Sequence, residues 1–177
     1  MGEMSLRAFH KQYGTKTSSV RIFTAYGPRE NESHAIVALI AKAVIKQTPF
    51  EIWGDGEQSR NFTYVGDIVK GLILASENII DGTAVNAGIS EFISLNRAAQ
   101  MVFAIIGWQP PEGVKHLTDK PVGVKHRAAD TSTAKKITGW QPDFSFEKGL
   151  TETINWYFAN KDPEEVRQHL QHLLMER

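Results

Sequence analysis

The sequence predicts an α/β fold with some parallel strand pairing, and three observations support this prediction. Short apolar runs bounded by turn residues, at 19–23, 50–53 and 83–87, have the length and composition of strands. Longer segments such as 33–46 and 95–106 carry apolar residues at helical spacing. The two kinds of segment alternate along the chain, which is typical of parallel strands joined by helices.

The first third of the chain is expected to contain two helices separated by a strand. Residues 3–13 form the first predicted helix, and Gly14 ends it because glycine readily adopts the left-handed conformation of a helix C-terminus. The strand at 19–23 leads into a turn at residues 26–28. The second helix spans about 33–46. Its apolar face consists of Ile36, Leu39, Ile40 and Ala43.

A strand at 50–53 comes next, and a glycine-rich turn at 54–56 closes it. Residues 61–65 form a further extended segment. Asp67 is expected to be the N-cap of a helix that continues to about Glu77, because its side chain can accept hydrogen bonds from the free N–H groups of the first turn.

The middle of the chain continues the alternation with a strand at 83–87. Ser94 is predicted to cap a helix that Gly107 ends. Residues 111–129 mix proline, glycine and short extended pieces. Asp130 is expected to cap a further short helix, and we predict this role for it rather than a catalytic one.

The last part of the chain is predicted to be helical. An amphipathic helix spans 146–159, and a second begins at Asp162-Pro163, because proline suits the first helical position and the acidic residues that follow favour the positive end of the helix dipole. We therefore divide the chain into a main unit, residues 1–160, and a C-terminal helical extension, residues 161–177.

Composition narrows the classes of function. The chain has 177 residues with 20 basic and 20 acidic side chains, so its formal net charge is zero. This balance does not favour nucleic acid or an anionic membrane as a partner, because both attract basic residues. No apolar run approaches the roughly 20 residues that span a bilayer. The chain has no cysteine, which fits a reducing cytoplasm, and its histidines show no metal-ligand pattern. We expect a cytoplasmic protein without a metal site.

Two motifs carry a family resemblance. Residues 21–29 are Arg-Ile-Phe-Thr-Ala-Tyr-Gly-Pro-Arg, and residues 53–67 are Trp-Gly-Asp-Gly-Glu-Gln-Ser-Arg-Asn-Phe-Thr-Tyr-Val-Gly-Asp. In this order they resemble the NAD-dependent epimerase/dehydratase family, which are extended short-chain dehydrogenases that remodel nucleotide sugars. The resemblance extends from residue 1 to about 160. The stretch 51–67 is most similar in pattern to the GDP-mannose 3,5-epimerases.

The resemblance implies that the chain is the C-terminal, substrate-binding half of such an enzyme. Strands 19–24 and 83–88 would be the last two parallel strands of a Rossmann sheet, followed by a small mixed α/β substrate domain. Glu3 matches a glutamate that relatives often carry four residues after the Lys of their catalytic Tyr-x-x-x-Lys pair, so that pair would lie before Met1. The glycine fingerprint of dinucleotide-binding proteins is absent from the sequence. We therefore expect NAD(H) in the complete protein, but no cofactor, catalytic residue or activity in this chain alone.

Two arginines are the main candidates for substrate binding. Arg60 follows a glycine-rich turn, and a guanidinium there can bind a diphosphate through two parallel hydrogen bonds; a solvated surface arginine is the alternative. The resemblance assigns Arg60 to the family's diphosphate-binding position. Arg127 stands where several members carry an arginine, and its alternative is a surface strand residue. Asn61, where the family more often has Asp, is expected to remove an ion-pair partner of Arg60.

The loop before the second helix supplies further candidates from the same resemblance. Thr24 stands where many members have an Asn that hydrogen-bonds the substrate, so we assign it to substrate binding. Tyr26, Gly27 and Pro28 look like the family's loop beside the nicotinamide and the sugar, and we assign them to cofactor binding. Glycine and proline also force a turn here and let the backbone approach a ligand.

Aromatic residues and one histidine complete the set of candidates. Trp53 and Phe62 can stack on a nucleotide base, and core packing is their alternative. His34 falls near the position where GDP-mannose 3,5-epimerases carry a Lys that acts as acid and base. Histidine can perform this chemistry near neutral pH, and a surface residue in a first helical turn is its alternative.

A non-enzymatic function stays open beside nucleotide-sugar epimerisation or dehydration. A fragment of this family can serve as a sugar-nucleotide-binding or oligomerisation module, and an unpaired sheet edge favours association. In the family, the helix with the catalytic pair packs in a four-helix dimer interface, and residues 3–13 would belong to it. We therefore expect two partners, which are a nucleotide diphosphate sugar and a second copy of the chain in a homodimer or a looser association.

Overall fold

A computed structural model of the chain describes residues 1–175, and the burial of their side chains as far as residue 170. Its helices are α1 (Gly2–Tyr13), α2 (Ala35–Val44), α3 (Val65–Asn78), α4 (Leu95–Ile106), α5 (Ser132–Thr138), α6 (Phe146–Asn160) and α7 (Pro163–Met175). Its strands are β1 (Thr17–Ile22), β2 (Ala25–Tyr26), β3 (Phe50–Trp53), β4 (Ser59–Arg60), β5 (Thr63–Tyr64), β6 (Asp81–Ala87), β7 (Ile93–Ser94), β8 (Val114–Leu117) and β9 (His126–Arg127).

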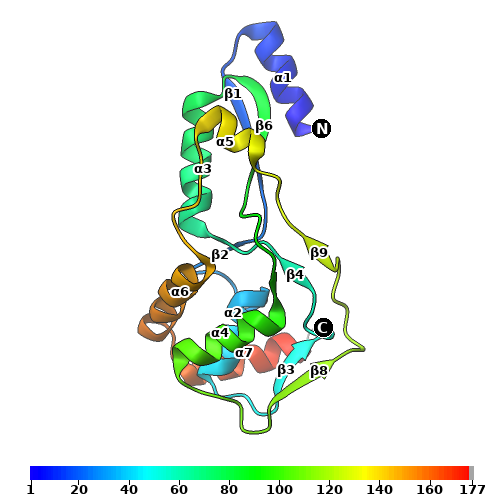
Figure 1. Ribbon diagram of the computed structural model, residues 1–177, viewed down its shortest axis with the longest axis vertical. Helices are drawn as coiled ribbons and strands as arrows, with labels where there is room; N and C mark the ends of the chain where they lie inside the picture. Colours follow the sequence, from blue (N-terminus) through cyan, green and yellow to red (C-terminus); the bar gives the residue numbers. More distant parts are fainter. Residues whose placement is uncertain (176–177) are drawn as a thin grey trace.

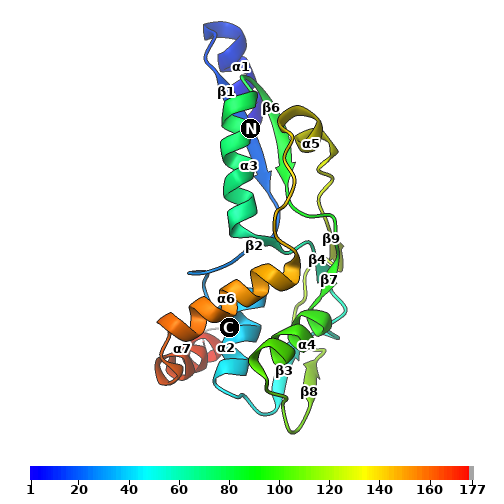
Figure 2. The same cartoon turned by 60° about the vertical axis from the view of Figure 1, so that its left-hand side comes forward.

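The molecule is elongated, with two packed ends joined by short strands (Figure 1). At one end α1, α3 and α5 lie around β1 and β6, and at the other α2, α4, α6 and α7 lie with β3 and β8. The short strands β2, β4 and β9 run between the ends, and Figure 2 shows the same division from a second direction. The predicted α/β class is confirmed.

Most of the strand pairing is parallel. β1 pairs with β6 in parallel, which confirms the parallel arrangement predicted for residues 19–24 and 83–88. β2 pairs with β5 and β3 with β8, again in parallel. β4 lies between β7, which is antiparallel to it, and β9, which is parallel. This last small sheet matters for the site because it joins three segments that are distant in the sequence.

Each end of the molecule has its own apolar core. The larger core lies around α2, α4 and α6 and includes Ile40, Phe50 and Leu150. The smaller core lies between β6, α3 and α5 and includes Val85 and Trp140. All four residues of the apolar face predicted for α2 are buried, so the helical spacing in the sequence identified the buried face correctly.

Several helix boundaries confirm the predicted caps. Gly14 and Gly107 follow α1 and α4 in the left-handed conformation, with φ of 66° and 70°. Ser94 Oγ accepts a hydrogen bond from a first-turn N–H of α4. Asp162 Oδ1 accepts two from the first turn of α7, which begins at Pro163 as predicted. These signals are local, and each side chain needs only its own helix end.

The capping role predicted for Asp67 is wrong, whereas Asp130 does bind the start of α5, one residue earlier than the N-cap position. α3 begins two residues before Asp67, whose buried carboxylate instead accepts hydrogen bonds from the backbone N–H groups of Asp143 (2.8 Å) and Phe144 (3.2 Å). Asp130 lies one residue before the N-cap of α5, and its carboxylate accepts a bond from the first N–H of that helix. Asp67 therefore joins α3 to the segment before α6.

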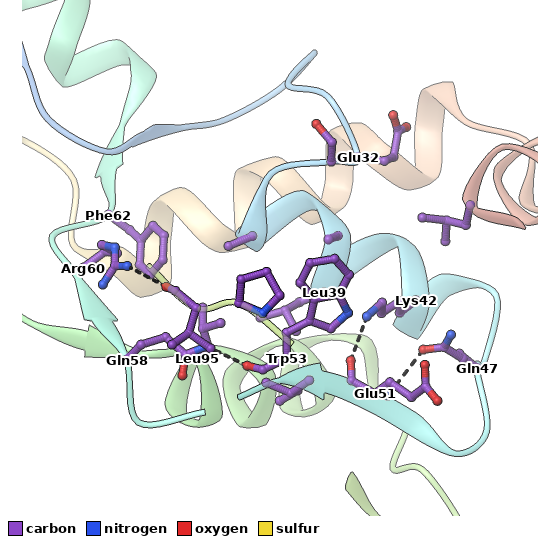
Figure 3. A pocket seen from close by; sticks show the side chains of 17 residues that line it. Glu32, Leu39, Lys42, Gln47, Glu51, Trp53, Gln58, Arg60, Phe62 and Leu95 are labelled. Carbon is purple, nitrogen blue, oxygen red and sulfur yellow. Dashed lines mark hydrogen bonds between the residues drawn. The ribbon is translucent and has the colours of Figure 1, made fainter. Parts of the chain in front are cut away.

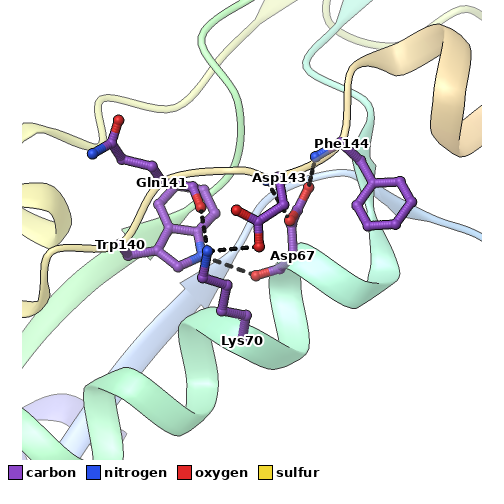
Figure 4. A network of polar contacts seen from close by, with 6 residues as sticks. All are labelled: Asp67, Lys70, Trp140, Gln141, Asp143 and Phe144. Atoms are coloured by element: carbon purple, nitrogen blue, oxygen red, sulfur yellow. Dashed lines mark hydrogen bonds and ion pairs between the residues drawn. The ribbon is translucent and has the colours of Figure 1, made fainter.

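A polar network around Asp67 reinforces this junction (Figure 4). Trp140 Nε1 donates to the Asp67 carbonyl at 2.9 Å, and the Trp140 ring packs in the smaller core. Lys70 Nζ lies 2.7 Å from Asp143 Oδ2 and donates to the Gln141 carbonyl at 3.2 Å. The network links the smaller core to the helix that enters the larger one.

The final helix shares the larger core. Val166 and Leu170 of α7 are buried in the same cluster as α2 and α6. We divided the chain at residue 160 from its sequence alone. In the structure the apolar core continues across this point, because α7 packs in the same cluster as α2 and α6.

Candidate functional site

A cavity of about 250 Å³ lies beside the larger core, and it is slightly smaller than the roughly 300–1,000 Å³ of most ligand pockets. Its walls come from α2, β3, β4, the start of α4, the segment 121–122 and α7 (Figure 3). Apolar side chains make up most of its lining. The charged lining residues are Glu32, Lys42, Glu51 and Arg60.

Arg60 and Arg127 lie next to each other in the central sheet. Arg60 lines the cavity from β4, and Arg127 on β9 is its direct partner in the parallel register. Arg127 Nη2 also donates a hydrogen bond to Thr24 Oγ1 at 3.2 Å. The structure thus brings together three of the substrate-binding candidates, although they are distant in sequence.

The two arginines have no anionic partner within the part of the chain that the structure describes. No carboxylate of these residues lies within 4.0 Å of either guanidinium. Burial, and then repulsion from Arg127, lowers the pKa of the Arg60 guanidinium, which is still protonated at neutral pH. Two adjacent cations without a counter-ion favour a dianionic ligand such as a diphosphate.

Arg60 also shapes one wall of the cavity. Its Nη1 donates to the carbonyls of Ser59 (2.8 Å) and Lys125 (3.3 Å), and its Nη2 donates to the carbonyl of Val122 (3.3 Å). Val122 itself lines the cavity, together with Pro121. The guanidinium is therefore held in place before any ligand binds.

The side chain of Asn61 lies apart from the Arg60 guanidinium. Asn61 is fully buried, and its amide is next to Gly88, where an added Cβ would be 2.6 Å from Nδ2. Arg60 and Phe62 instead share the cavity side, as expected for alternate residues of an extended segment. The structure thus shows no contact through which a residue at position 61 would orient Arg60.

The two aromatic candidates occupy different environments. Phe62 is buried and packs edge-on against Tyr26 and at a tilt against Phe146. It therefore has a role in the core and also lines the cavity. Trp53 is half-buried at the end of β3, and the Lys120 ammonium lies 6.0 Å from the centre of its ring. Trp53 is therefore the more exposed of the two aromatic rings.

The residues assigned to cofactor binding are engaged within the fold. Tyr26 is buried, and its hydroxyl donates to the Phe146 carbonyl at 2.9 Å. Gly27 is needed for a close approach to α3, because an added Cβ would lie 2.5 Å from Val65 Cγ1. The Tyr26 side chain and Gly27 therefore have packing roles in this fold, which a cofactor is not needed to explain.

His34 lies outside the cavity lining. It is the N-cap of α2, its ring is exposed, and its Nδ1 lies 2.9 Å from Glu30 Oε1. Burial raises the pKa of the Glu30 carboxyl, and the hydrogen bond to His34 acts in the opposite direction. The His34 ring thus has a local hydrogen-bonding partner on the same loop.

Lys42, which was not among the candidates from the sequence, lines the cavity from α2. Its ammonium donates to the Glu51 carbonyl at 2.7 Å. No motif marks this lysine. Lys42 follows Leu39 by three residues and Ala38 by four, so it lies on the same face of the helix, and both of these residues line the cavity. This spacing could have identified Lys42 from the sequence.

A Tyr-x-x-x-Lys spacing does occur in the chain, at Tyr157 and Lys161, contrary to the expectation that the chain lacks such a pair. Both groups contact the buried carboxylate of Glu32. The Tyr157 hydroxyl donates to Glu32 Oε1 at 3.1 Å, and Lys161 Nζ lies 2.9 Å from the same oxygen. Burial raises the pKa of the Tyr157 hydroxyl. The pair ties α6 to the loop before α2, away from Arg127 and Thr24.

Neither a metal site nor a membrane span appears in the part of the chain that the structure describes. Up to residue 170, as far as side chains are described, no group of three or more histidine or acidic side chains is placed to hold a metal ion. None of the described helices is both long and apolar enough to cross a bilayer.

The fold is that of a mostly parallel α/β protein with two adjacent arginines beside a cavity, and comparison with known proteins gives its family. Residues 1–88 match the model of the NAD dependent epimerase/dehydratase family. The chain belongs to this family, which confirms the resemblance.

Relatives of known name agree with this assignment. UDP-glucuronate 4-epimerase of Thermodesulfobacterium geofontis is 36% identical over 159 residues, which are 89% of this chain and 48% of that protein. GDP-mannose 3,5-epimerase of Arabidopsis thaliana is 29% identical, over 90% of this chain and 42% of that protein. The chain therefore spans about half the length of the curated relatives that it matches.

A solved structure gives the same result. UDP-glucuronic acid 4-epimerase from Bacillus cereus, determined in complex with UDP-glucuronic acid and NAD, superposes with a TM-score of 0.78 at 31% identity. The match covers 90% of this chain and 51% of that one. The fold is thus that of the extended short-chain dehydrogenase epimerases.

Proposed function

We propose that the complete protein is an NAD-dependent nucleotide-sugar epimerase or dehydratase, and that this chain binds the nucleoside diphosphate part of the substrate. The observation that carries the proposal is the pairing of Arg60 with Arg127 beside a cavity that Trp53 and Phe62 line. A diphosphate would lie on the two guanidinium groups and its base in the cavity. Thr24, hydrogen-bonded to Arg127, would lie on the sugar side.

In this proposal the chain contributes binding energy at a distance from the reacting carbon. Contacts to the diphosphate and the base fix the sugar in one position, and this positioning lowers the barrier of a step that occurs elsewhere. NAD(H) would supply hydride transfer in the complete protein. The residues of this chain that we assigned to it, Tyr26, Gly27 and Pro28, offer one edge of such a site.

The first test is calorimetric titration of the chain with UDP and GDP, using Arg60→Ala. We expect the variant to weaken binding at least tenfold, because loss of a charge-assisted hydrogen bond costs about 1.5–3 kcal/mol. Arg127→Ala should have an effect of similar size. Arg60→Lys should be intermediate, since it keeps the charge but not the bidentate geometry.

The control for this test is Arg97→Ala, which removes an exposed arginine of α4 that does not line the cavity. The affinity of Arg97→Ala for UDP and GDP should match that of the unaltered chain. Equal affinity of Arg60→Ala and the unaltered chain would contradict the proposed diphosphate site.

We further propose that the 177 residues alone have no turnover, and that the protein acts in the cytoplasm. The absence of the glycine fingerprint from the sequence supports the first statement, and the absence of cysteine supports the second. Measurable NAD-dependent conversion of a UDP- or GDP-sugar by the chain alone would contradict the first.

A second candidate function is that of a binding or oligomerisation module. Exposed apolar side chains on α1 favour it, because α1 has no buried residue and shows Met4, Phe9 and Tyr13 on its surface. We propose that a second copy of the chain covers this surface, as a homodimer or in a looser association.

A further inference from the structure

Lys42 places a positive charge in the wall of the cavity. It projects from α2, in the same lining as Ala38 and Leu39. The hydrogen bond to the Glu51 carbonyl uses one of its three N–H donors. The remaining donors favour an acceptor on a ligand, because a partly buried ammonium group without enough acceptors is unstable.

The surroundings of Lys42 show that its charge is exposed to little water. Burial lowers the pKa of its ammonium group, and attraction to Glu51 only partly opposes this effect. A hydrogen bond from such a group to a ligand oxygen is stronger than the same bond at the surface.

An acceptor lies next to this donor. Glu51 on β3 lines the same part of the cavity, and its carboxylate is 4.0 Å from the exposed Lys115 ammonium. The cavity wall therefore presents an ammonium donor from Lys42 and a carboxylate acceptor from Glu51 close together.

Trp53 relates this pair to the arginine site. Glu51 and Trp53 are two residues apart on β3, so their side chains lie on the same face of the strand, and both line the cavity. Figure 3 shows Lys42 and Arg60 on opposite sides of Trp53. A planar ring stacked on Trp53, with its diphosphate on Arg60, would have its far edge beside Lys42 and Glu51.

We propose that Lys42 and Glu51 select a nucleobase with a ring carbonyl beside a ring N–H, as in uracil, thymine and guanine. Lys42 donates to the carbonyl oxygen, and Glu51 accepts from the N–H. Adenine and cytosine present the reverse pattern, with an amino group next to a ring nitrogen acceptor. Their amino group would face the Lys42 ammonium, and their ring nitrogen would face the Glu51 carboxylate. This selection rests on the proposed function, since it requires that a nucleoside diphosphate binds here.

The sharpest test compares two ligands that differ only at this edge. Inosine diphosphate carries the carbonyl and the N–H, whereas ADP has the same ring system with the amino group and the bare nitrogen. Calorimetric titration of the unaltered chain should show at least tenfold tighter binding of inosine diphosphate. UDP and GDP should also bind more tightly than CDP and ADP. Equal affinity for inosine diphosphate and ADP would overturn the proposal without any variant.

Variants then separate this proposal from the diphosphate site. Lys42→Met keeps the apolar stem but removes the donor, so it should reduce the preference for inosine diphosphate over ADP to less than threefold. Lys42→Arg keeps a cationic donor and should retain the preference. Arg60→Ala should weaken the binding of both ligands by the same factor and leave the ratio of their affinities unchanged.

The outcomes distinguish the two proposals. Binding that depends on Arg60 but shows an unchanged ligand ratio in Lys42→Met overturns the base selection and leaves the diphosphate site intact. Absence of binding by all nucleotides overturns the proposed function of this chain, and the base selection with it.

Discussion

Glu32 shows how single residues tie the walls of the cavity together. It lies in the loop before α2, is 6% exposed, and contacts Tyr157 and Lys161 at the end of α6. His169 on α7 lies 3.8 Å from its second oxygen. One carboxylate therefore links three segments of the larger core, and it also lines the cavity.

The titration of Glu32 gives a residue-scale prediction for stability. Burial acts to raise its pKa, but the hydrogen bonds from Lys161 and Tyr157 outweigh it and lower the pKa of the folded carboxyl. A lowered pKa stabilises the fold above the unfolded value of about 4.3, and this contribution is lost as pH falls through the folded pKa. Glu32→Gln should therefore reduce the free energy of unfolding at pH 7 by about 1–3 kcal/mol.

Urea unfolding at several pH values checks this prediction. The difference in unfolding free energy between the unaltered chain and Glu32→Gln should be constant above pH 6. This difference should narrow as pH falls below about 5, because the carboxyl of the unfolded chain begins to take up a proton there while that of the folded chain is still ionised. A difference that is independent of pH would show that Glu32 does not contribute through its charge. Glu147→Gln, on the first turn of α6 and exposed, is the matched control.

At the scale of elements, the turn after β2 depends on the absence of a side chain at Gly27. This turn lies against the first residue of α3, Val65, at a distance that leaves no room for a Cβ. Gly27→Ala should destabilise the fold by about 1–3 kcal/mol, as overpacking does. Thermal unfolding of the variant measures the effect.

A double variant tests the cause of this loss. Gly27→Ala combined with Val65→Ala should recover most of it, because Val65 is partly exposed and its truncation removes the colliding methyl group. Gly2→Ala is the control, since an added Cβ at Gly2 meets no atom within 4 Å. If the two substitutions at 27 and 65 were additive, the contact would not be the reason that glycine is needed.

The helix ends that the sequence predicts correctly are those with local capping residues. Gly14, Gly107 and Ser94 act on neighbours within one helical turn, and all three predictions are confirmed. Asp67 has the same chemistry as a cap, but its carboxylate binds N–H groups far along the chain. The sequence does not distinguish these two uses of an aspartate, because both need only a carboxylate near the start of a helix.

At the scale of the molecule, the two ends differ in how well their surfaces are covered. The larger core is enclosed by four helices, whereas α1 at the other end covers β1 and β6 without burying any side chain of its own. The Phe9 and Tyr13 rings lie 5.4 Å apart on its surface and are 54% and 64% exposed. Such an apolar surface favours association.

Light scattering tests this association on the whole chain. We expect a mass above the 19.8 kDa of one chain, increasing with concentration. Phe9→Glu combined with Tyr13→Glu should shift the mass toward one chain, because it places charge on the apolar surface. Lys136→Glu on α5 alters charge at an exposed site of the same end and should leave the mass unchanged. A mass of 19.8 kDa at all concentrations would exclude self-association through α1.

The sequence by itself determined the α/β class, the family motifs, the positions of most helices and the choice of Arg60 and Arg127 as candidates. These features depend on periodicity, on caps and on short motifs, which act between residues that are close along the chain. Only the tertiary structure placed Arg127 beside Arg60 and Lys42 in the same cavity as Trp53, and only it gave Tyr157 and Lys161 a common partner in Glu32. The physical reason is that these contacts arise from the packing of segments distant in sequence, and no local pattern specifies which distant segments meet.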